Sequence, residues 1–323
     1  MVKDTWTKKI IMNLKIFIII IFFFIIKNNQ LLALEEYKII LKVENDIITN
    51  VDLINEKKYL IALNNEILNL AEEKFLQIAK NSIVKEKIKK NEVKKHFEEN
   101  YKYEFSEAVL KNYSNRLGLN SIDELKEYFS KFNLNLNFVK AKIKNDDMWN
   151  RIIFNKYKNQ INVNINELKN RLKKEIKNNQ NIVTEYNISE IQFNLNIGEN
   201  LEQKYNQIIN SINNNGFKVA SNLHSISETS KFGGKIGWVN KTSMSSFISD
   251  KLEKLNIGEI TKPINIRNLF LILKIEDKKE SKIKIDFEKE LKKLINFETN
   301  KQFNQFSLIY LNKIRQNIFI SDQ

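Results

Sequence analysis

The sequence predicts an α+β fold: a mainly helical body, completed by a helix near the C-terminus, into which one compact α+β unit is inserted. Apolar residues recur at helical spacing over long stretches, and the chain of 323 residues contains only 7 Gly and 1 Pro. This scarcity of turn formers favours long helices. Apart from one hairpin close to the start of the helical part, strand patterns and a Gly-rich turn fall within residues 186–275. A chain of this length can form two domains with separate cores.

The N-terminal segment predicts export. Residues 16–26 (IFIIIIFFFII) form an uninterrupted apolar run that follows three lysines. At about 1.5 Å per residue the run spans roughly 16 Å, about half of a bilayer core, which fits a secretory signal better than a membrane-spanning helix. Ala33 supplies a small residue for cleavage, so we expect a signal peptide over 1–33. An uncleaved anchor and a start at Met12 are the alternatives.

Composition excludes several classes of function. The net charge of +14 comes from lysines spread along the whole chain, without a Lys/Arg block and interleaved aromatics, so no nucleic-acid partner is expected. The absence of Cys excludes thiol catalysis and thiolate metal sites. The two histidines, His96 and His224, lie in unrelated contexts and predict neither a catalytic triad nor a zinc site. No cofactor or metal is expected.

The first structural elements after the signal are a hairpin and a helix. Residues 37–43 (YKIILKV) are β-branched and apolar, residues 44–46 predict a turn, and the strand resumes at Ile47. Thr49, with Asp52 three residues later, predicts the capped start of a helix.

Further helices follow from spacing and caps. Gly118 predicts the end of a helix over 105–117, and Ser121 with Glu124 forms a capping box for the next one. Two more helices are expected over 138–160 and, capped by Asn166, over 167–178. A final helix, 287–315, carries an apolar stripe that cannot stay exposed without promoting association.

The pattern changes from Tyr186 onward. A short strand (ISEIQF), a helix over 201–214, the segment GGKIGW, a helix around 245–255 and a strand over 269–275 predict a compact α+β unit. The Gly cluster lacks the Gly-Lys-Ser/Thr ending of a phosphate loop.

These segments resemble the parvulin family of prolyl isomerases. Residues 217–238 (FKVASNLHSISETSKFGGKIGW) resemble the pattern F-A-x-x-A-x-x-x-S-x-D-x-x-x-x-x-G-G-x-L-G-W, in register without a gap. Residues 244–263 (MSSFISDKLEKLNIGEITKP) resemble the M-x-x-x-[FI] and L-K-x-G-E-[IV]-S-x-P segments that follow it. The resemblance implies an FKBP-like parvulin domain. Its glycines would allow positive φ and close backbone approach.

The helical part resembles the N-terminal domain of SurA-like chaperones. The resemblance rests on residues 43–53 (VENDIITNVDL), on residues 146–168, and on residues 306–320, which are similar to a terminal helix that packs back on that domain. It implies a helical chaperone domain over 34–180, one parvulin domain over 181–280 and the C-terminal helix over 281–323.

The parvulin resemblance also implies site positions. The family site has an apolar rim, for which Met244, Ile248 and Phe270 are the candidates here, with Trp238 as a further substrate-binding residue. Its polar set consists of two His, an Asp or Cys, and a Ser or Thr.

In this register that polar set is depleted. Glu190 and Leu271 occupy the two His positions, Ser227 occupies the Asp or Cys position, and Ser225 retains the family Ser. We expect a degenerate site whose isomerase activity is weak or absent.

The resemblance implies a chaperone in the periplasm of a Gram-negative bacterium. Its expected partners are unfolded or nascent envelope and outer-membrane polypeptides, bound in an apolar groove between helical body and parvulin domain, and membrane contact is expected only through the signal segment. The alternatives are an active peptidyl-prolyl isomerase and a membrane-anchored scaffold.

Overall fold

The computed structural model describes residues 37–97, 103–104, 106–178, 182–196, 198–266, 269–282 and 286–322. The chain divides at Lys38, and the elements below belong to the unit Ile39–Gln323. The predicted export signal and its cleavage point near Ala33 lie outside the described residues. None of the described helices combines the length and the apolar character needed to cross a membrane.

The described part begins with an antiparallel hairpin, β1 (Ile39–Val43) and β2 (Asp46–Thr49). From the other end of the chain β7 (Ile320–Asp322) pairs with β1, giving the sheet order β2-β1-β7. Thr49 then caps α2 (Asn50–Leu63): its Oγ1 accepts from the backbone N–H of Asp52, and the Asp52 carboxylate accepts from that of Thr49 at 2.8 Å. The predicted hairpin and capping box are confirmed.

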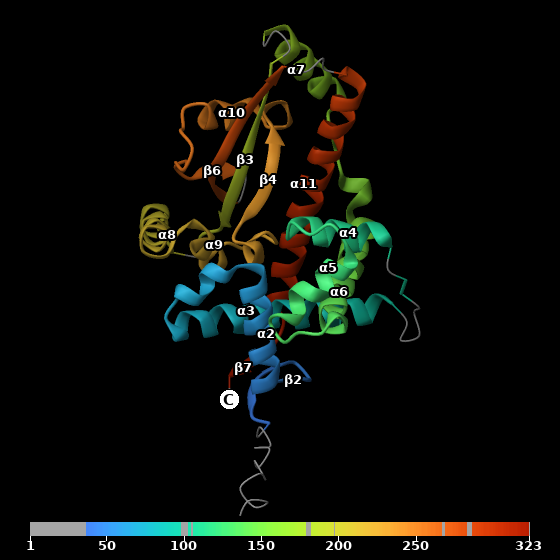
Figure 1. Ribbon diagram of the computed structural model, residues 1–323, viewed down its shortest axis with the longest axis vertical. Coiled ribbons are helices and arrows are strands. Elements are labelled where there is room, and N and C mark those ends of the chain that lie inside the picture. The colour runs from blue at the N-terminus through green and yellow to red at the C-terminus, as the bar shows by residue number, and fades with distance from the viewer. Residues whose placement is uncertain are drawn as a thin grey trace, which may run out of the picture. The chain divides into compact units, whose positions relative to one another are not determined.

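Helices form the body of this unit (Figure 1). Two helices begin at other residues than expected. Ser106 caps α4 (Glu107–Arg116), and Asn164, not Asn166, accepts from the backbone N–H of Glu167 at the start of α7 (Ile165–Asn178). The helical segments are α2, η1 (Asn65–Asn69), α3 (Glu72–His96), α4 (Glu107–Arg116), α5 (Ile122–Ser130), α6 (Leu136–Tyr157), η2 (Lys158–Gln160), α7 (Ile165–Asn178) and, at the other end of the chain, α11 (Phe287–Arg315).

The long C-terminal helix α11 packs on the helical body. Tyr157 of α6 stacks on Phe306 with ring centroids 4.5 Å apart. Trp149, which is fully buried, stacks on Tyr310 and donates from Nε1 to Ser307 Oγ at 2.8 Å. At the other end of α11, Leu291 and Leu294 form a small core with Leu168 and Leu172 of α7. Residues more than 100 positions apart in the sequence therefore share one core.

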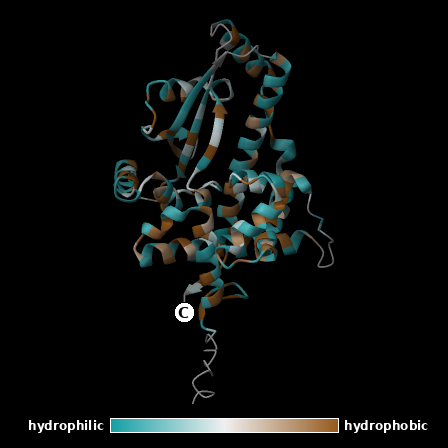
Figure 2. Ribbon diagram, viewed as in Figure 1, coloured by the Kyte–Doolittle hydropathy of each residue, from teal (hydrophilic) through white to brown (hydrophobic). Residues whose placement is uncertain are grey.

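The inserted unit is built on an antiparallel sheet of order β4-β3-β6-β5. Its strands are β3 (Ile182–Phe193), β4 (Lys235–Asn240), β5 (Ile264–Ile266) and β6 (Leu269–Lys282), and its helical segments are α8 (Leu201–Asn215), α9 (Phe217–His224), η3 (Ser230–Phe232), η4 (Lys241–Ser243) and α10 (Ser246–Leu252). Both long strands extend further than predicted: β3 already begins at Ile182, and β6 continues beyond its apolar part into the polar stretch 276–282 (EDKKESK). The far end of β6 is accordingly hydrophilic in Figure 2.

Side-chain alternation gives this sheet two apolar faces. One face carries Tyr186, Ile188, Leu271 and Leu273 and packs with Met244. The other face carries Ile191, Phe193 and Ile272 and is covered by α8 and α9. The mainly helical body with one α+β unit confirms the predicted fold class.

Candidate functional site

The Gly-rich turn brings the loop after α9 against β3. Gly233, Gly234 and Gly237 all have positive φ. At Gly234 a Cβ would lie 2.3 Å from the carbonyl oxygen of Glu190, so only glycine allows this approach. The carbonyl of Gly234 in turn accepts from the backbone N–H of Glu190 at 2.8 Å. The glycines thus hold the loop beside Glu190.

Glu190 is the centre of a buried polar group. One oxygen of its carboxylate, Oε1, accepts from Ser227 Oγ at 2.6 Å and from Thr229 Oγ1 at 3.0 Å. The other oxygen, Oε2, accepts from Gln192 Nε2 at 2.7 Å. These bonds satisfy a carboxylate whose residue is only 6% exposed. The structure therefore brings together Glu190 and Ser227, two of the four expected site positions.

The other two expected polar positions contribute differently. Ser225 Oγ accepts from the backbone N–H groups of Gln192 at 3.0 Å and Ser227 at 3.3 Å, so it holds the loop to β3. Leu271 packs in the apolar core of the sheet and supplies no polar group. Sequence reasoning did not single out Thr229 or Gln192, although the spacing Ser225, Ser227, Thr229 on one extended segment was available as a signal.

A cavity of about 260 Å³ lies between this site and α11. Of the expected apolar rim, Met244, Ile248 and Phe270 all line it, together with Leu271 and Glu190. From α11 the lining includes Phe297, Asn300, Lys301, Asn304 and Gln305. The cavity can hold an apolar side chain or ring against the sheet, with amide groups facing it from the helix.

Trp238 does not line this cavity. It is 42% exposed, and Lys279 Nζ lies 4.2 Å from its ring centroid. The sequence analysis expected Trp238 to be a substrate-binding residue. Its neighbour on β4, Val239, lines the cavity. Because successive residues of a strand face opposite sides, Trp238 points away from it.

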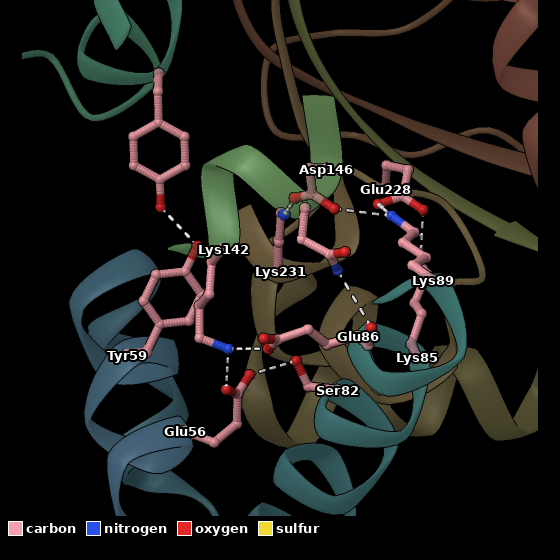
Figure 3. Close-up of polar contacts among 12 residues, drawn as sticks. Glu56, Tyr59, Ser82, Lys85, Glu86, Lys89, Lys142, Asp146, Glu228 and Lys231 are labelled. Atoms are coloured by element: carbon pink, nitrogen blue, oxygen red, sulfur yellow. Dashed lines mark hydrogen bonds and ion pairs between the residues drawn. The ribbon is translucent and has the colours of Figure 1, made fainter. Parts of the chain in front are cut away.

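A second cavity, of about 290 Å³, lies between the helical body and the loop of the inserted unit, and charged side chains line it. Lys89 of α3 lies 2.9 Å from Asp146 of α6 and 3.0 Å from Glu228, and Lys231 lies 2.6 Å from Asp146 (Figure 3). Lys85 completes the group at 3.1 Å from Glu228. Of the two cavities, the one over Met244 is the more apolar.

The ion pairs shift the pKa values of both carboxyl groups. Burial alone would raise the pKa of Glu228, but Lys85 and Lys89 outweigh it and lower that pKa to about 2. Burial likewise opposes ionisation of Asp146, and the ammonium groups of Lys231 and Lys89 lower its pKa well below the usual range. Both groups are therefore ionised at neutral pH, and the loop residues Glu228 and Lys231 are bound to the helical body through charge.

Apolar contacts reinforce this attachment. Phe232, next to Lys231, is buried among the helices, where it meets Tyr113 edge to face at 6.0 Å and lies 5.1 Å from the guanidinium of Arg116. In the last turn of α9, just before this loop, Asn64 Nδ2 donates to Asn222 Oδ1 at 2.6 Å. The loop that carries Ser227 and Thr229 is thus held on one side by β3 and on the other by the helical body.

Neither histidine enters the polar group around Glu190. His96 lies on the last turn of α3, with Nδ1 3.0 Å from the carbonyl oxygen of Glu92. His224 lines the charged cavity, and burial, followed by Lys204 and Lys74, lowers its pKa to about 4. Within the described ranges, no group of three or more His, Asp or Glu side chains is arranged to hold a metal ion.

Comparison with known proteins identifies the inserted unit. Residues 194–277 match the family model described as Rotamase, PPIC-type PPIase domain. A stretch of 56 residues, 17% of the chain, is 39% identical to the chaperone SurA of Pseudomonas putida and spans 13% of that protein's length. Residues 194–277 thus match the PPIC-type family whose motif the sequence resembles, and the likeness to SurA is confined to one stretch of 56 residues.

Solved structures of related proteins are more distant. A crystal structure of a PpiC-type peptidyl-prolyl isomerase domain is 26% identical and covers 30% of this chain and 94% of its own, with a TM-score of 0.27. A SurA-like chaperone of Campylobacter jejuni is 15% identical, with 88% and 98% covered and a TM-score of 0.32. The foldase PrsA of Streptococcus pneumoniae is 15% identical, with 87% and 94% covered and a TM-score of 0.29.

Proposed function

We propose that this protein is a chaperone that binds unfolded polypeptides and isomerises prolyl bonds weakly or not at all. The PPIC-type domain and the similarity to SurA support the proposal. The observation that carries the proposal is the cavity over β3 and β6. It keeps the apolar rim of Met244, Ile248 and Phe270, whereas the two His positions hold Glu190, already bonded to three donors, and Leu271.

The physical reason is that binding and catalysis depend on different groups. Rotation about a prolyl bond has a barrier of roughly 20 kcal/mol, and lowering it requires polar groups that favour the twisted amide over the planar one. Such groups act as a unit and fail together when several are missing. Apolar contacts contribute roughly 25 cal/mol per Å² buried, independently of the neighbouring acid-base chemistry. Binding therefore persists where catalysis is lost.

The proposed clients are unfolded envelope and outer-membrane polypeptides in the periplasm of a Gram-negative bacterium. The short apolar run at 16–26, the preceding lysines and the small residue Ala33 support export by a cleaved signal. Mass spectrometry of the protein recovered from its cells should find a mature form beginning near Leu34. Recovery of the intact hydrophobic segment from membranes would favour the anchored scaffold instead.

The decisive experiment measures binding and turnover on the intact chain. A labelled proline-containing peptide should bind, whereas its isomerisation, followed by a protease-coupled or NMR exchange assay, should stay close to the uncatalysed rate. The double substitution Glu190→His with Leu271→His tests whether restoring both imidazoles raises turnover. Robust turnover by the natural chain that Glu190→Gln abolishes would reject the proposal.

A matched pair of variants tests whether the cavity binds the peptide. Ile248 lines it, whereas Ile257 is 59% exposed and does not. Ile248→Ser should weaken peptide binding by roughly tenfold or more, since burying one such side chain is worth about 1.5–3 kcal/mol. Ile257→Ser should leave it unchanged, and the same order should appear in suppression of client aggregation. Equal effects of the two variants would place the binding surface elsewhere.

An active isomerase is the second candidate, because one arrangement favours it. The hydroxyls of Ser227 and Thr229 lie 3.0 Å apart beside the Glu190 carboxylate, and Thr229 and Glu190 both line the cavity. Hydroxyl and carboxylate groups can hydrogen-bond a peptide amide while it twists. Loss of turnover in Ser227→Ala and Thr229→Val would support that role.

A further inference from the structure

The apolar cavity of the PPIC-type domain carries a basic rim drawn from three separate elements. Arg116 comes from the last residue of α4, Lys235 from the first residue of β4, and Lys301 from the middle of α11. Two of the three, Arg116 and Lys301, belong to helices of the body and not to the PPIC-type domain. The charge around the cavity is therefore set by the way the two parts pack.

The abundance of lysine in the chain does not by itself account for this rim. Basic residues outnumber acidic ones by 53 to 39 overall, but among the described residues that line the cavity Glu190 carries the one carboxylate. Its oxygens accept three hydrogen bonds from Ser227, Thr229 and Gln192, so it is already satisfied within the wall. The basic groups at the rim are left for another partner.

The rim residues are available to that partner. Neither Arg116 nor Lys235 forms an ion pair with another described residue, and both are exposed. Lys301 approaches Glu298 one turn away at 3.5 Å, a surface contact of little energetic weight. The guanidinium of Arg116 lies over the ring of Phe232 at 5.1 Å, which holds it near the cavity without using its hydrogen-bond donors.

We propose that this cavity selects client segments in which an apolar residue, such as proline, is flanked by Asp or Glu. The inference rests on the peptide-binding function proposed above and specifies its substrate class. The apolar residue lies against Met244 and Ile248 on the sheet, and the flanking carboxylates lie at the rim, near Lys235 on one wall and Lys301 on the other. The low dielectric of an apolar wall strengthens attraction between such charges.

The test compares two fluorescent heptapeptides on the intact chain, each with one central proline. In one peptide glutamate flanks the proline on both sides, and in the other glutamine does. At low salt the glutamate peptide should bind roughly tenfold more tightly, the combined effect of a few exposed ion pairs. Raising the salt to about 0.5 M should remove most of this preference, because the Debye length falls to a few ångströms.

Variants then assign the preference to the rim. Lys235→Gln combined with Lys301→Gln should reduce the ratio of the two dissociation constants to about two or less. The matched control is Lys262→Gln, which removes an exposed charge of the same domain outside the cavity lining. It should keep the ratio close to that of the natural chain.

The outcomes separate this inference from the function on which it rests. If both peptides bind equally well, or if Lys262→Gln lowers the ratio as much as the rim substitutions do, the basic rim has no selective role and only the inference fails. If neither peptide binds, the peptide-binding function fails and the inference fails with it. A preference that persists at high salt would also overturn the inference, since it would not be electrostatic.

Discussion

Breaking the ion pair between Asp146 and Lys231 should loosen the site loop from the helical body. Asp146 lies on α6, and Lys231 lies in η3, between the site hydroxyls and the Gly-rich turn, with 2.6 Å between their charged atoms. We consider Asp146→Asn, Lys231→Met and the double variant. Each single substitution removes one charge while keeping a side chain of similar length in place, and the double variant removes both charges.

The structure sets the size of the effect. Removing one partner of a fully buried pair costs about 3–5 kcal/mol, but here 33% of the Asp146 side chain and 21% of the Lys231 side chain are exposed. We therefore expect about 2 kcal/mol for Asp146→Asn, which leaves two lysines short of a carboxylate. Lys231→Met should cost about 1 kcal/mol, because Asp146 keeps Lys89 at 2.9 Å. The double variant should lose about 2 kcal/mol, so the coupling is about 1 kcal/mol.

Two measurements on the intact chain check this. Urea unfolding followed by tryptophan fluorescence provides the free energies of the cycle, and hydrogen exchange should show faster exchange over 227–234 in Asp146→Asn. The matched control is the more exposed pair Lys218 and Glu66 at the same interface, 50% and 38% exposed, for which coupling should stay below about 0.5 kcal/mol. Additive costs for Asp146 and Lys231 together with unchanged exchange would refute the reasoning.

Acid should destabilise the chain through His224, whose pKa is lowered from 6.5 to about 4 in the folded state. The contribution of the neutral imidazole to the free energy of unfolding is therefore present above pH 6.5 and is lost as the pH falls to 4. At pH 5 the loss should be at most about 2 kcal/mol. His224→Gln should flatten this part of the curve of unfolding free energy against pH, and an unchanged curve would contradict the assignment. Gly234→Ala should cost about 3 kcal/mol or more, because its Cβ would meet the Glu190 carbonyl, whereas Gly237→Ala, also at positive φ but with open space, should cost about 1–2 kcal/mol. Equal losses in urea unfolding would rule out the close approach as the cause. Deleting residues 283–323 removes α11 and uncovers Trp149, so the thermal midpoint should fall by several degrees; an unchanged midpoint would show that α11 does not stabilise the body.

Features encoded by neighbouring residues could be predicted from the sequence. The hairpin and the Thr49 capping box depend on contacts within about ten residues, and both form as expected. The PPIC-type domain was detectable because its motif is one continuous run ending at Trp238, in which the positions of Gly233 and Gly234 are constrained by backbone geometry. The apolar rim of Met244, Ile248 and Phe270 could be named because it follows that motif in register.

The polar part of the site depended on tertiary structure. Sequence register placed Glu190 and Ser227 at site positions, but only the fold shows that they bond to each other and that Thr229 and Gln192 complete the group. These partners come from β3 and from a loop more than 30 residues away. Hydroxyl and amide side chains are common throughout the chain, so their types alone predict no such group.

Which charged side chains are paired also depended on tertiary structure. The sequence determined that the chain is basic, that it lacks thiols and that its helices are amphipathic, because these follow from composition and from periodicity along one segment. It did not distinguish Lys89 and Lys231, which are paired with carboxylates at the interface, from Lys235, which remains exposed beside a cavity. Only the packing of α3, α6 and α11 against the inserted unit decided that difference, since a lysine is paired or left free by the groups that folding brings within a few ångströms of it.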